Sequence, residues 1–261
     1  ADEVRKNWMG MKEADDGCTL AADRLYFNKQ FTALDIWRKA RLMVEHNRPR
    51  SARNSVQIIA PDSAQLVPEA FNNAEKFLAK HIAAPQKVRQ ELVVMALIKV
   101  ATTDADKADK LMRNKWQPYL TTEERHWVWG VIGRQAAMRL DDDALSHFAR
   151  VAHDKDLNDD MLGWKTRAAL RAGNTPKWAL VESSINAMSA DARKDPTWIY
   201  WHARALLARK KVTQPIQQEA NAMFESIAGV RGFYEQLALD ELGQRVSTPL
   251  RPDALTEQEK D

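Results

Sequence analysis

Few residues in this sequence have the types and the spacing that catalysis or metal binding needs. Side chains that bind transition metals are one thiol, Cys18, and six histidines: His46, His81, His126, His147, His153 and His202. They form neither the His-Glu-x-x-His pattern nor the close Cys/His sets of zinc sites. The sequence also lacks a Gly-x-Gly-x-x-Gly fingerprint, a phosphate-binding loop and a Gly-x-Ser-x-Gly turn. We therefore predict no metal site, no cofactor and no catalytic residue in this chain.

Clustered acidic residues have a simpler explanation than catalysis. Three aspartates occupy positions 141–143, and two more are Asp159 and Asp160. Both groups lie at expected helix starts, where carboxylates favour the positive end of the helix dipole. His147 and His153 are six residues apart, a spacing that places them on different faces of a helix. We expect both histidines at the surface.

The distribution of charge argues against nucleic-acid binding. Lys and Arg number 39 against 36 Asp and Glu, which gives a formal net charge of +3. Both signs alternate along the chain, as in the stretch DADKADK at 104–110, whereas nucleic-acid binders gather basic residues on one face. The apolar run Leu92–Ile98 is shorter than the roughly 20 residues that a membrane span requires. We expect neither a nucleic-acid partner nor a membrane span.

Apolar residues recur at helical spacing along almost the whole chain. The segment 31–44 follows the i, i+3, i+4, i+7 pattern of one buried helix face, and alternation at period two is nearly absent. Thr121 offers a helix cap, with Glu124 three residues later. The pattern predicts an all-α protein with helices at 17–27, 31–46, 49–59, 63–82, 86–101, 104–116, 122–139, 143–152, 158–172, 176–188, 196–209, 215–228 and 231–242.

The helix starts are regularly spaced. Comparable starts fall at Pro85, Thr121, Leu157, Asp195 and Arg231, which are 36 to 38 residues apart. Such a period is typical of a solenoid of helical hairpins, close to the roughly 34-residue tetratricopeptide repeat. The strict tetratricopeptide consensus is absent, so the repeat is degenerate. We predict an α-superhelix of tetratricopeptide-like hairpins, U-shaped or arc-shaped, in which the tryptophans of the repeats pack in the core.

Three stretches go beyond a helical pattern. CTLAADRLY begins at Cys18 and is followed by ALDIW at 33–37, and WKTRAAL lies at 164–170. The most specific stretch is DPTWIYWHARAL at 195–206, which is followed by RGFY at 231–234. This order resembles the superhelical region of the soluble lytic murein transglycosylases. In that family a Trp-x-Tyr-Trp-x-Ala helix precedes an Arg-Gly-Phe-Tyr helix, which closes a U-shaped array.

The resemblance extends from about Cys18 to Gly243 and is strongest after Asp195. It implies a structural role for the motif residues, which are Trp198, Tyr200, Trp201, Arg231, Gly232, Phe233 and Tyr234. Arg231–Tyr234 would close the array, with Phe233 and Tyr234 packed inward.

Members of this family are periplasmic enzymes that cleave the bond between N-acetylmuramic acid and N-acetylglucosamine in peptidoglycan and leave a 1,6-anhydro end. A separate lysozyme-like domain performs the cleavage, with a general-acid Glu in a Glu-Ser motif and a later Gly-Leu-Met-Gln motif. The resemblance therefore implies peptidoglycan as a partner, a catalytic domain of the same polypeptide as a second partner, and a periplasmic location.

This sequence departs from the family pattern where the catalytic domain would follow. Glu182-Ser183 and Glu225-Ser226 are the two Glu-Ser dipeptides, each lies within an expected helix, and no Gly-Leu-Met-Gln follows. General-acid catalysis needs a carboxylic acid with a raised pKa in a dry cleft, which an exposed solenoid face does not offer. We expect an α-superhelical domain at 1–245 and a tail or linker toward a missing catalytic part at 246–261.

Cys18 leaves two alternatives open. An odd cysteine in an exported protein suggests a missing disulfide partner. The resemblance implies the same, because Cys18 is similar to a cysteine of the family that can pair with one upstream, which here would precede Ala1. The other alternative is a buried free thiol. The single cysteine and the ending at Asp261 lead us to expect a fragment cut at both ends.

The sequence as a whole predicts the non-catalytic superhelical scaffold of a soluble lytic transglycosylase, inactive alone. A tetratricopeptide-like scaffold for protein–protein interaction explains the repeat period equally well, but it leaves the pairing of the 198–201 and 231–234 motifs unexplained. A helical-repeat RNA binder would need a basic groove that the interspersed acidic residues deny.

Overall fold

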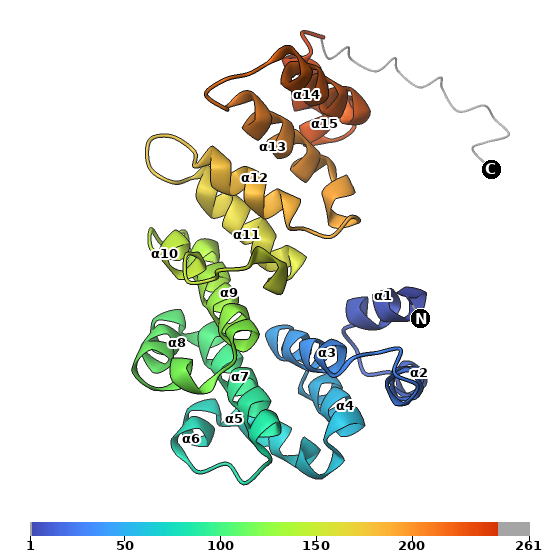
Figure 1. The fold of residues 1–261 in the computed structure, drawn as a ribbon, viewed down its shortest axis with the longest axis vertical. Coiled ribbons are helices and arrows are strands. Elements are labelled where there is room, and N and C mark those ends of the chain that lie inside the picture. Colours follow the sequence, from blue (N-terminus) through green and yellow to red (C-terminus); the bar gives the residue numbers. More distant parts are fainter. Residues whose placement is uncertain (1, 245–261) are drawn as a thin grey trace, which may run out of the picture. The chain divides into compact units, whose positions relative to one another are not determined.

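Helices provide all of the regular structure in residues 2–244, the part of the chain that the computed structural model describes (Figure 1). No strand occurs in this range, and the all-α prediction is confirmed. The chain divides into two compact units, unit 1 up to Leu157 and unit 2 from Asn158 on. The tail expected at 246–261 lies outside the described residues. None of the helices in the described range is both long enough and apolar enough to cross a membrane.

Unit 1 is built from ten α-helices joined by short turns. They are α1 (Asp2–Gly10), α2 (Asp16–Phe27), α3 (Ala33–Glu45), α4 (Pro49–Ile59), α5 (Val67–Asn72), α6 (Ala74–Ala79), α7 (Gln86–Thr103), α8 (Ala105–Leu111), α9 (Thr122–Met138) and α10 (Ala144–Phe148). Shorter helical turns are η1 (Pro61–Leu66), the π-helical turn η2 (Met112–Trp116), η3 (Gln117–Tyr119) and η4 (Asp154–Asp156).

The described part of unit 2, up to residue 244, contains five α-helices. They are α11 (Asp159–Leu170), α12 (Trp178–Asn186), α13 (Pro196–Leu207), α14 (Gln214–Ile227) and α15 (Phe233–Glu241), with a 3-10 turn, η5 (Ala192–Lys194), before α13. Consecutive helices pack against each other, so that α13 contacts α12, α14 and α15. The core between α13, α14 and α15 contains Tyr200, Leu206 and Phe224, which are all buried.

The spacing of the helices confirms the predicted period. Helices α7, α9, α11, α13 and α15 begin at residues 86, 122, 159, 196 and 233, which are 36 or 37 residues apart. In each of the hairpins α9/α10, α11/α12 and α13/α14, the first helix packs against the second. A hairpin buries only part of its apolar surface, so that neighbouring hairpins within each unit supply the rest of the core.

Local sequence explains how α9 begins. Thr121 caps the helix: its hydroxyl accepts a hydrogen bond from the Glu124 N–H at 3.4 Å, and the Glu124 carboxylate accepts one from the Thr121 N–H at 2.7 Å. This reciprocal pair is a capping box, as the sequence predicted. Thr32 and Asp35 form the same arrangement at the start of α3.

Two predictions of helix extent are wrong. The helix expected at 63–82 is divided into η1, α5 and α6, because Pro68 cannot donate a backbone hydrogen bond and Asn73 has a non-helical conformation with φ −131°. Helix α1 was not expected, because its sequence, DEVRKNWMG, has little apolar periodicity. Its Trp8 is nevertheless buried, with its ring 5.4 Å from that of Phe31.

Candidate functional site

The 198–201 motif lies on α13, and the structure brings part of it together with the 231–234 motif on α15. Tyr200 is buried, and its ring centroid lies 5.5 Å from that of Tyr234 and 5.7 Å from that of Phe224. Trp201 is half-buried beside the same Tyr234, with the ring centroids 6.3 Å apart. We call Tyr200, Trp201, Phe224 and Tyr234 the aromatic cluster. It joins α13, α14 and α15.

Polar atoms at the rim of the aromatic cluster are also paired. The Trp201 indole N–H donates to the Tyr234 hydroxyl at 3.3 Å, and the Tyr200 hydroxyl donates to Glu241 at 3.1 Å. Arg204 donates to Glu241 at 2.6 Å and to the Tyr200 hydroxyl at 3.0 Å. Burial raises the pKa of Tyr200, so the phenol stays protonated and acts as a donor. These bonds fix α13 to the first turn of α15 through Tyr234 and to its last turn through Glu241.

Arg231 and Gly232 do not join the aromatic cluster, and Phe233 contacts only its edge, with its ring centroid 5.2 Å from that of Tyr234. Gly232 precedes α15, and its N–H donates to the Glu235 carboxylate at 2.6 Å. A Cβ atom at this position would lie 2.8 Å from the carboxylate carbon of Glu235, so a side chain here would disturb the cap. Arg231 is exposed. Phe233 is 70% exposed, which corrects the expectation that it packs inward; only Tyr234 does so in part.

Trp198 lies away from the aromatic cluster, against α11. A Cβ atom on Gly163 would come within 2.9 Å of its ring, so α11 and α13 approach closely at a glycine. The Arg167 guanidinium carbon lies 4.9 Å from the Trp198 ring and 5.0 Å from the Trp164 ring. The 198–201 motif therefore contacts α11 through Trp198 and α15 through Tyr200 and Trp201.

Neither Glu-Ser dipeptide has the surroundings of a general acid. Glu182 on α12 accepts two hydrogen bonds from Arg209, of 2.6 and 3.2 Å. Glu225 on α14 is exposed. Ser183 and Ser226 each donate to a carbonyl oxygen of their own helix. All four residues act as ordinary helix-surface residues.

Cys18 is a partly buried free thiol at the start of α2. Burial raises its pKa, and the neighbouring Asp15 adds to that shift. A raised pKa lowers the thiolate fraction, which is the reactive form. Lys39 lies near it, with the ammonium donating to the carbonyl oxygens of Trp8 and Met11, and burial lowers the pKa of this lysine to about 8.

The largest set of polar residues that the sequence did not reveal is buried in unit 1, between α3, α7 and α9, which lie side by side (Figure 1). Arg41 and Glu91 both have fully buried side chains and form a bidentate pair with two bonds of 2.8 Å. Arg41 also binds Glu123 on α9 at 2.8 Å. Burial opposes the charge of Arg41, but Glu91 and Glu123 outweigh it and raise the pKa of the guanidinium.

Further cations complete this set. Lys87 lies 2.7 Å from Glu91 and 2.5 Å from Glu124, and Arg38 lies 3.0 Å from Glu123. Thr121 belongs to the set through its N–H, which donates to Glu124. We call the whole set the ionic cluster; its seven members are Arg38, Arg41, Lys87, Glu91, Thr121, Glu123 and Glu124. Every carboxylate in it has at least one cationic partner. These ion pairs join α3, α7 and α9, so the arrangement clamps the three helices together.

Two other charged groups lie at the edge of the ionic cluster. The Trp127 indole N–H donates to Glu45 at 2.7 Å, and Glu45 also binds Arg134 at 3.0 Å. His126 is buried: its Nε2 accepts from the Ala152 N–H at 3.1 Å, so its Nδ1 carries the proton and donates to Asp156 at 2.7 Å. Within residues 2–244, no three His, Cys, Asp or Glu side chains are grouped as metal ligands.

The expected position of His147 is wrong. This histidine is buried on α10, with its ring stacked 6.2 Å from that of Trp129, and burial lowers its pKa. Asp109 on α8 lies 3.4 Å from its Nδ1. His153 is exposed, as expected. The spacing rule did not apply to this pair, because α10 ends at Phe148 and His153 follows it outside any helix.

Solved structures similar to this chain are lytic transglycosylases. An inactive mutant of the lytic transglycosylase Slt from Pseudomonas aeruginosa is 23% identical, with a TM-score of 0.51 over 93% of this chain and 39% of that protein. The 70-kDa soluble lytic transglycosylase of Escherichia coli is 16% identical, with a TM-score of 0.54 over 98% of this chain and 41% of that protein. A complex of the 70-kDa enzyme with bulgecin A gives a TM-score of 0.53 at 16% identity, over 97% and 41%.

These likenesses concern the fold. The chain shares the helical architecture of the lytic transglycosylases over almost all of its length, and it spans about two fifths of their length. No protein-family model matches the chain, and no curated protein matches its sequence.

Proposed function

We propose that this chain is the superhelical scaffold of a periplasmic lytic transglycosylase and has no catalytic activity of its own. The observation that carries the proposal is the joining of the 198–201 and 231–234 motifs by Tyr200, Trp201 and Tyr234, in a chain whose fold is similar to lytic transglycosylases. A general helical scaffold has no need for this pairing of motifs.

The parent enzyme in this proposal cleaves the bond between N-acetylmuramic acid and N-acetylglucosamine in peptidoglycan to give 1,6-anhydro products. Residues 1–245 hold the helical array, and residues 246–261 lead toward the catalytic domain. The acidic side chains support this division of labour, because the carboxylates of the ionic cluster and Glu182 are paired with cations. A glycosidic general acid lies in a cleft beside the leaving-group oxygen, whereas these carboxylates are bound by basic side chains of neighbouring segments.

Purified peptidoglycan tests the proposal directly. The 261-residue chain and a longer version, extended by about 200 residues of its coding region, about the size of one domain, are each incubated with peptidoglycan, and anhydro-muropeptides are detected by mass spectrometry. We expect release by the longer version alone. Release by the short chain would overturn the scaffold role. Inactivity of a folded longer version would contradict the assignment to lytic transglycosylases and favour a protein-interaction scaffold.

A further inference from the structure

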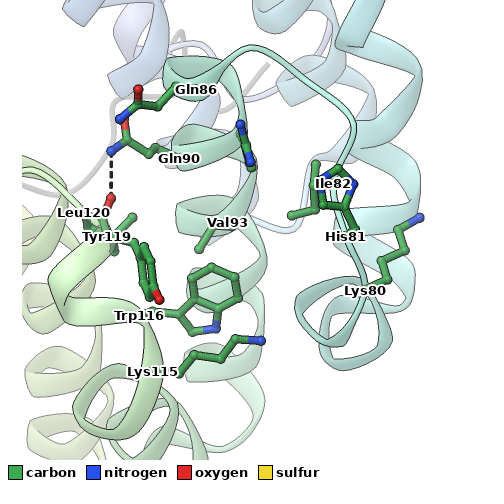
Figure 2. A pocket seen from close by; sticks show the side chains of 11 residues that line it. Lys80, His81, Ile82, Gln86, Gln90, Val93, Lys115, Trp116, Tyr119 and Leu120 are labelled. Carbon is green, nitrogen blue, oxygen red and sulfur yellow. Dashed lines mark hydrogen bonds between the residues drawn. The ribbon is translucent and has the colours of Figure 1, made fainter.

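A pocket opens in unit 1 beside the first half of α7 (Figure 2). One wall is the segment 80–82 after α6, the floor is the first half of α7, and the other wall is formed by η2 and η3. Its volume is about 390 Å³. Small-molecule sites have volumes of about 300–1,000 Å³, so the pocket has room for one monosaccharide-sized ligand.

The cationic side chains of this pocket have no acidic counterpart in its lining. Lys80, Arg89 and Lys115 line it together with His81, and no acidic residue does. Lys80 is neutralised by Glu69 at 2.5 Å, and Lys115 donates to the Leu78 carbonyl oxygen at 3.0 Å. Arg89 forms no ion pair with any residue in the described part of the chain, although its side chain is half-buried. An anion in the pocket would supply the missing counter-charge.

Trp116 adds an aromatic ring to the lining, and the Lys115 ammonium lies 4.5 Å from the centre of that ring. Its indole nitrogen is buried and has no hydrogen-bond partner within residues 2–244. The tryptophan therefore offers its ring to a ligand, and its nitrogen stays inside the protein. The tryptophan ends the π-helical turn η2, a rare conformation that is often found at functional sites. The turn places Trp116 and Lys115 against the pocket (Figure 2).

Apolar and amide groups complete the lining. Tyr119 is 64% exposed, so one face of its ring is open to a ligand. Its carbonyl oxygen accepts a hydrogen bond of 2.6 Å from the Gln90 side chain, which fixes η3 to α7 (Figure 2). Gln86 contributes a second amide, and an amide both donates and accepts. Val93, on the floor, is apolar.

We propose that this pocket binds a sugar acid, a monosaccharide that carries a carboxylate. Arg89 pairs with the carboxylate, and the flat C–H face of the sugar ring packs on Tyr119 beside the Trp116 ring. Gln86 and Gln90 bind the hydroxyl groups. A neutral sugar would leave Arg89 unpaired, and an apolar acid would leave the amides without partners.

Nuclear magnetic resonance of the tryptophan indole N–H groups tests the proposal on this 261-residue chain. The probe is N-acetylmuramic acid, and the neutral comparison is N-acetylglucosamine. The Trp116 signal is assigned as the one that disappears in Trp116→Phe. We expect N-acetylmuramic acid to shift this signal saturably and N-acetylglucosamine to bind at least about tenfold more weakly, the size of one charge-assisted hydrogen bond.

Two arginine variants provide the matched comparison. Arg89→Gln should weaken binding of the acid about tenfold or more and leave the weak binding of the neutral sugar unchanged. Arg53→Gln, on the exposed side of α4, is the control and should bind the acid as the unaltered chain does. Circular dichroism confirms that each variant is folded.

Three results would overturn the proposal. They are no shift of the Trp116 signal at the highest soluble concentration of acid, equal affinity for the two sugars, and affinity for N-acetylglutamate as high as for the sugar acid. This binding test is independent of the proposed function, which depends on anhydro-muropeptide release by the longer chain. Either can fail while the other stands.

Discussion

The two units hold their helices together by different means. In unit 1 the centre is ionic: Arg41 and Glu91 have no solvent exposure, and they join α3 to α7. In unit 2 the centre is aromatic: Tyr200 and Phe224 join α13 to α14, and Tyr234 adds α15. The ion pair of unit 2 at Arg204 and Glu241 is at the rim, where these side chains are 38% and 28% exposed.

This difference affects what each unit tolerates. A buried ion pair contributes little over a well-packed apolar pair, but removing one partner leaves a charge in a medium that cannot solvate it. An aromatic cluster loses contacts in proportion to the atoms removed. Unit 1 should therefore respond most to the loss of a charge, and unit 2 to the loss of volume.

The largest effect is expected from Arg41→Met. The change leaves the buried Glu91 carboxylate without its bidentate partner and should lower the free energy of unfolding by about 3–5 kcal/mol, as measured by urea denaturation. Arg204→Met in unit 2 is the matched change and should cost about 1 kcal/mol or less, because the Arg204 pair is partly exposed.

A double variant separates charge from packing in unit 1. Arg41→Met combined with Glu91→Leu removes both charges and should recover a large part of the lost stability. Equal costs for Arg41→Met and Arg204→Met would remove the proposed contrast between the two units.

The next largest effect is expected in the aromatic cluster. Phe224→Ala should cost about 3 kcal/mol, because the ring is buried between α13 and α14 and its removal leaves a cavity. Tyr200→Phe keeps the volume and should cost only about 1 kcal/mol, the value of a hydrogen bond. Urea denaturation of both variants makes the comparison; a greater loss from Tyr200→Phe would mean that polar contacts dominate unit 2 as well.

Lys39 in unit 1 predicts a dependence on pH. Burial lowers the pKa of the folded amine to about 8, whereas an unfolded lysine keeps its proton to about 10.4. Between these values the unfolded chain binds more protons, so the free energy of unfolding contributed by Lys39 rises with pH. Relative to Lys39→Met, the unaltered chain should gain about 1–3 kcal/mol between pH 8 and pH 10.

An exposed lysine provides the control for this pH effect. Lys76→Met on α6 should follow the unaltered chain across the same range, because an exposed amine has similar surroundings in the folded and unfolded states. Urea denaturation at several pH values measures both. A constant difference between the unaltered chain and Lys39→Met would show that Lys39 is not desolvated.

The smallest effect is expected at Phe233. This side chain is 70% exposed, so Phe233→Ser should change the free energy of unfolding by no more than about 0.5 kcal/mol. Tyr234→Ser should cost more, since the Tyr234 ring contacts Tyr200 and Trp201. Thermal denaturation compares the two variants. Similar losses of stability would mean that Phe233 packs inward, as the sequence predicted.

Helix positions followed from the sequence wherever the signal was local. The Thr121 cap, the apolar spacing of 31–44 and the period of 36 or 37 residues depend on neighbours within one or two turns, and the structure has them. The helix expected at 63–82 failed because a continuous apolar pattern concealed the breaks near Pro68 and Asn73. Helix α1 was missed because its one large apolar anchor, Trp8, is stabilised by Phe31 from another segment.

The sequence by itself determined the all-α class and the hairpin period, because apolar periodicity and repeat spacing are visible in a single chain. The family resemblance indicated Tyr200, Trp201 and Tyr234, which join α13 to α15. Tertiary structure alone decided which charges meet. Arg41 and Glu91 are 50 residues apart, and Trp116, Arg89 and Tyr119 acquire a common pocket only when η2 and η3 fold against α7. Charge pairing and pocket formation depend on distances between helices, and no local pattern encodes those distances.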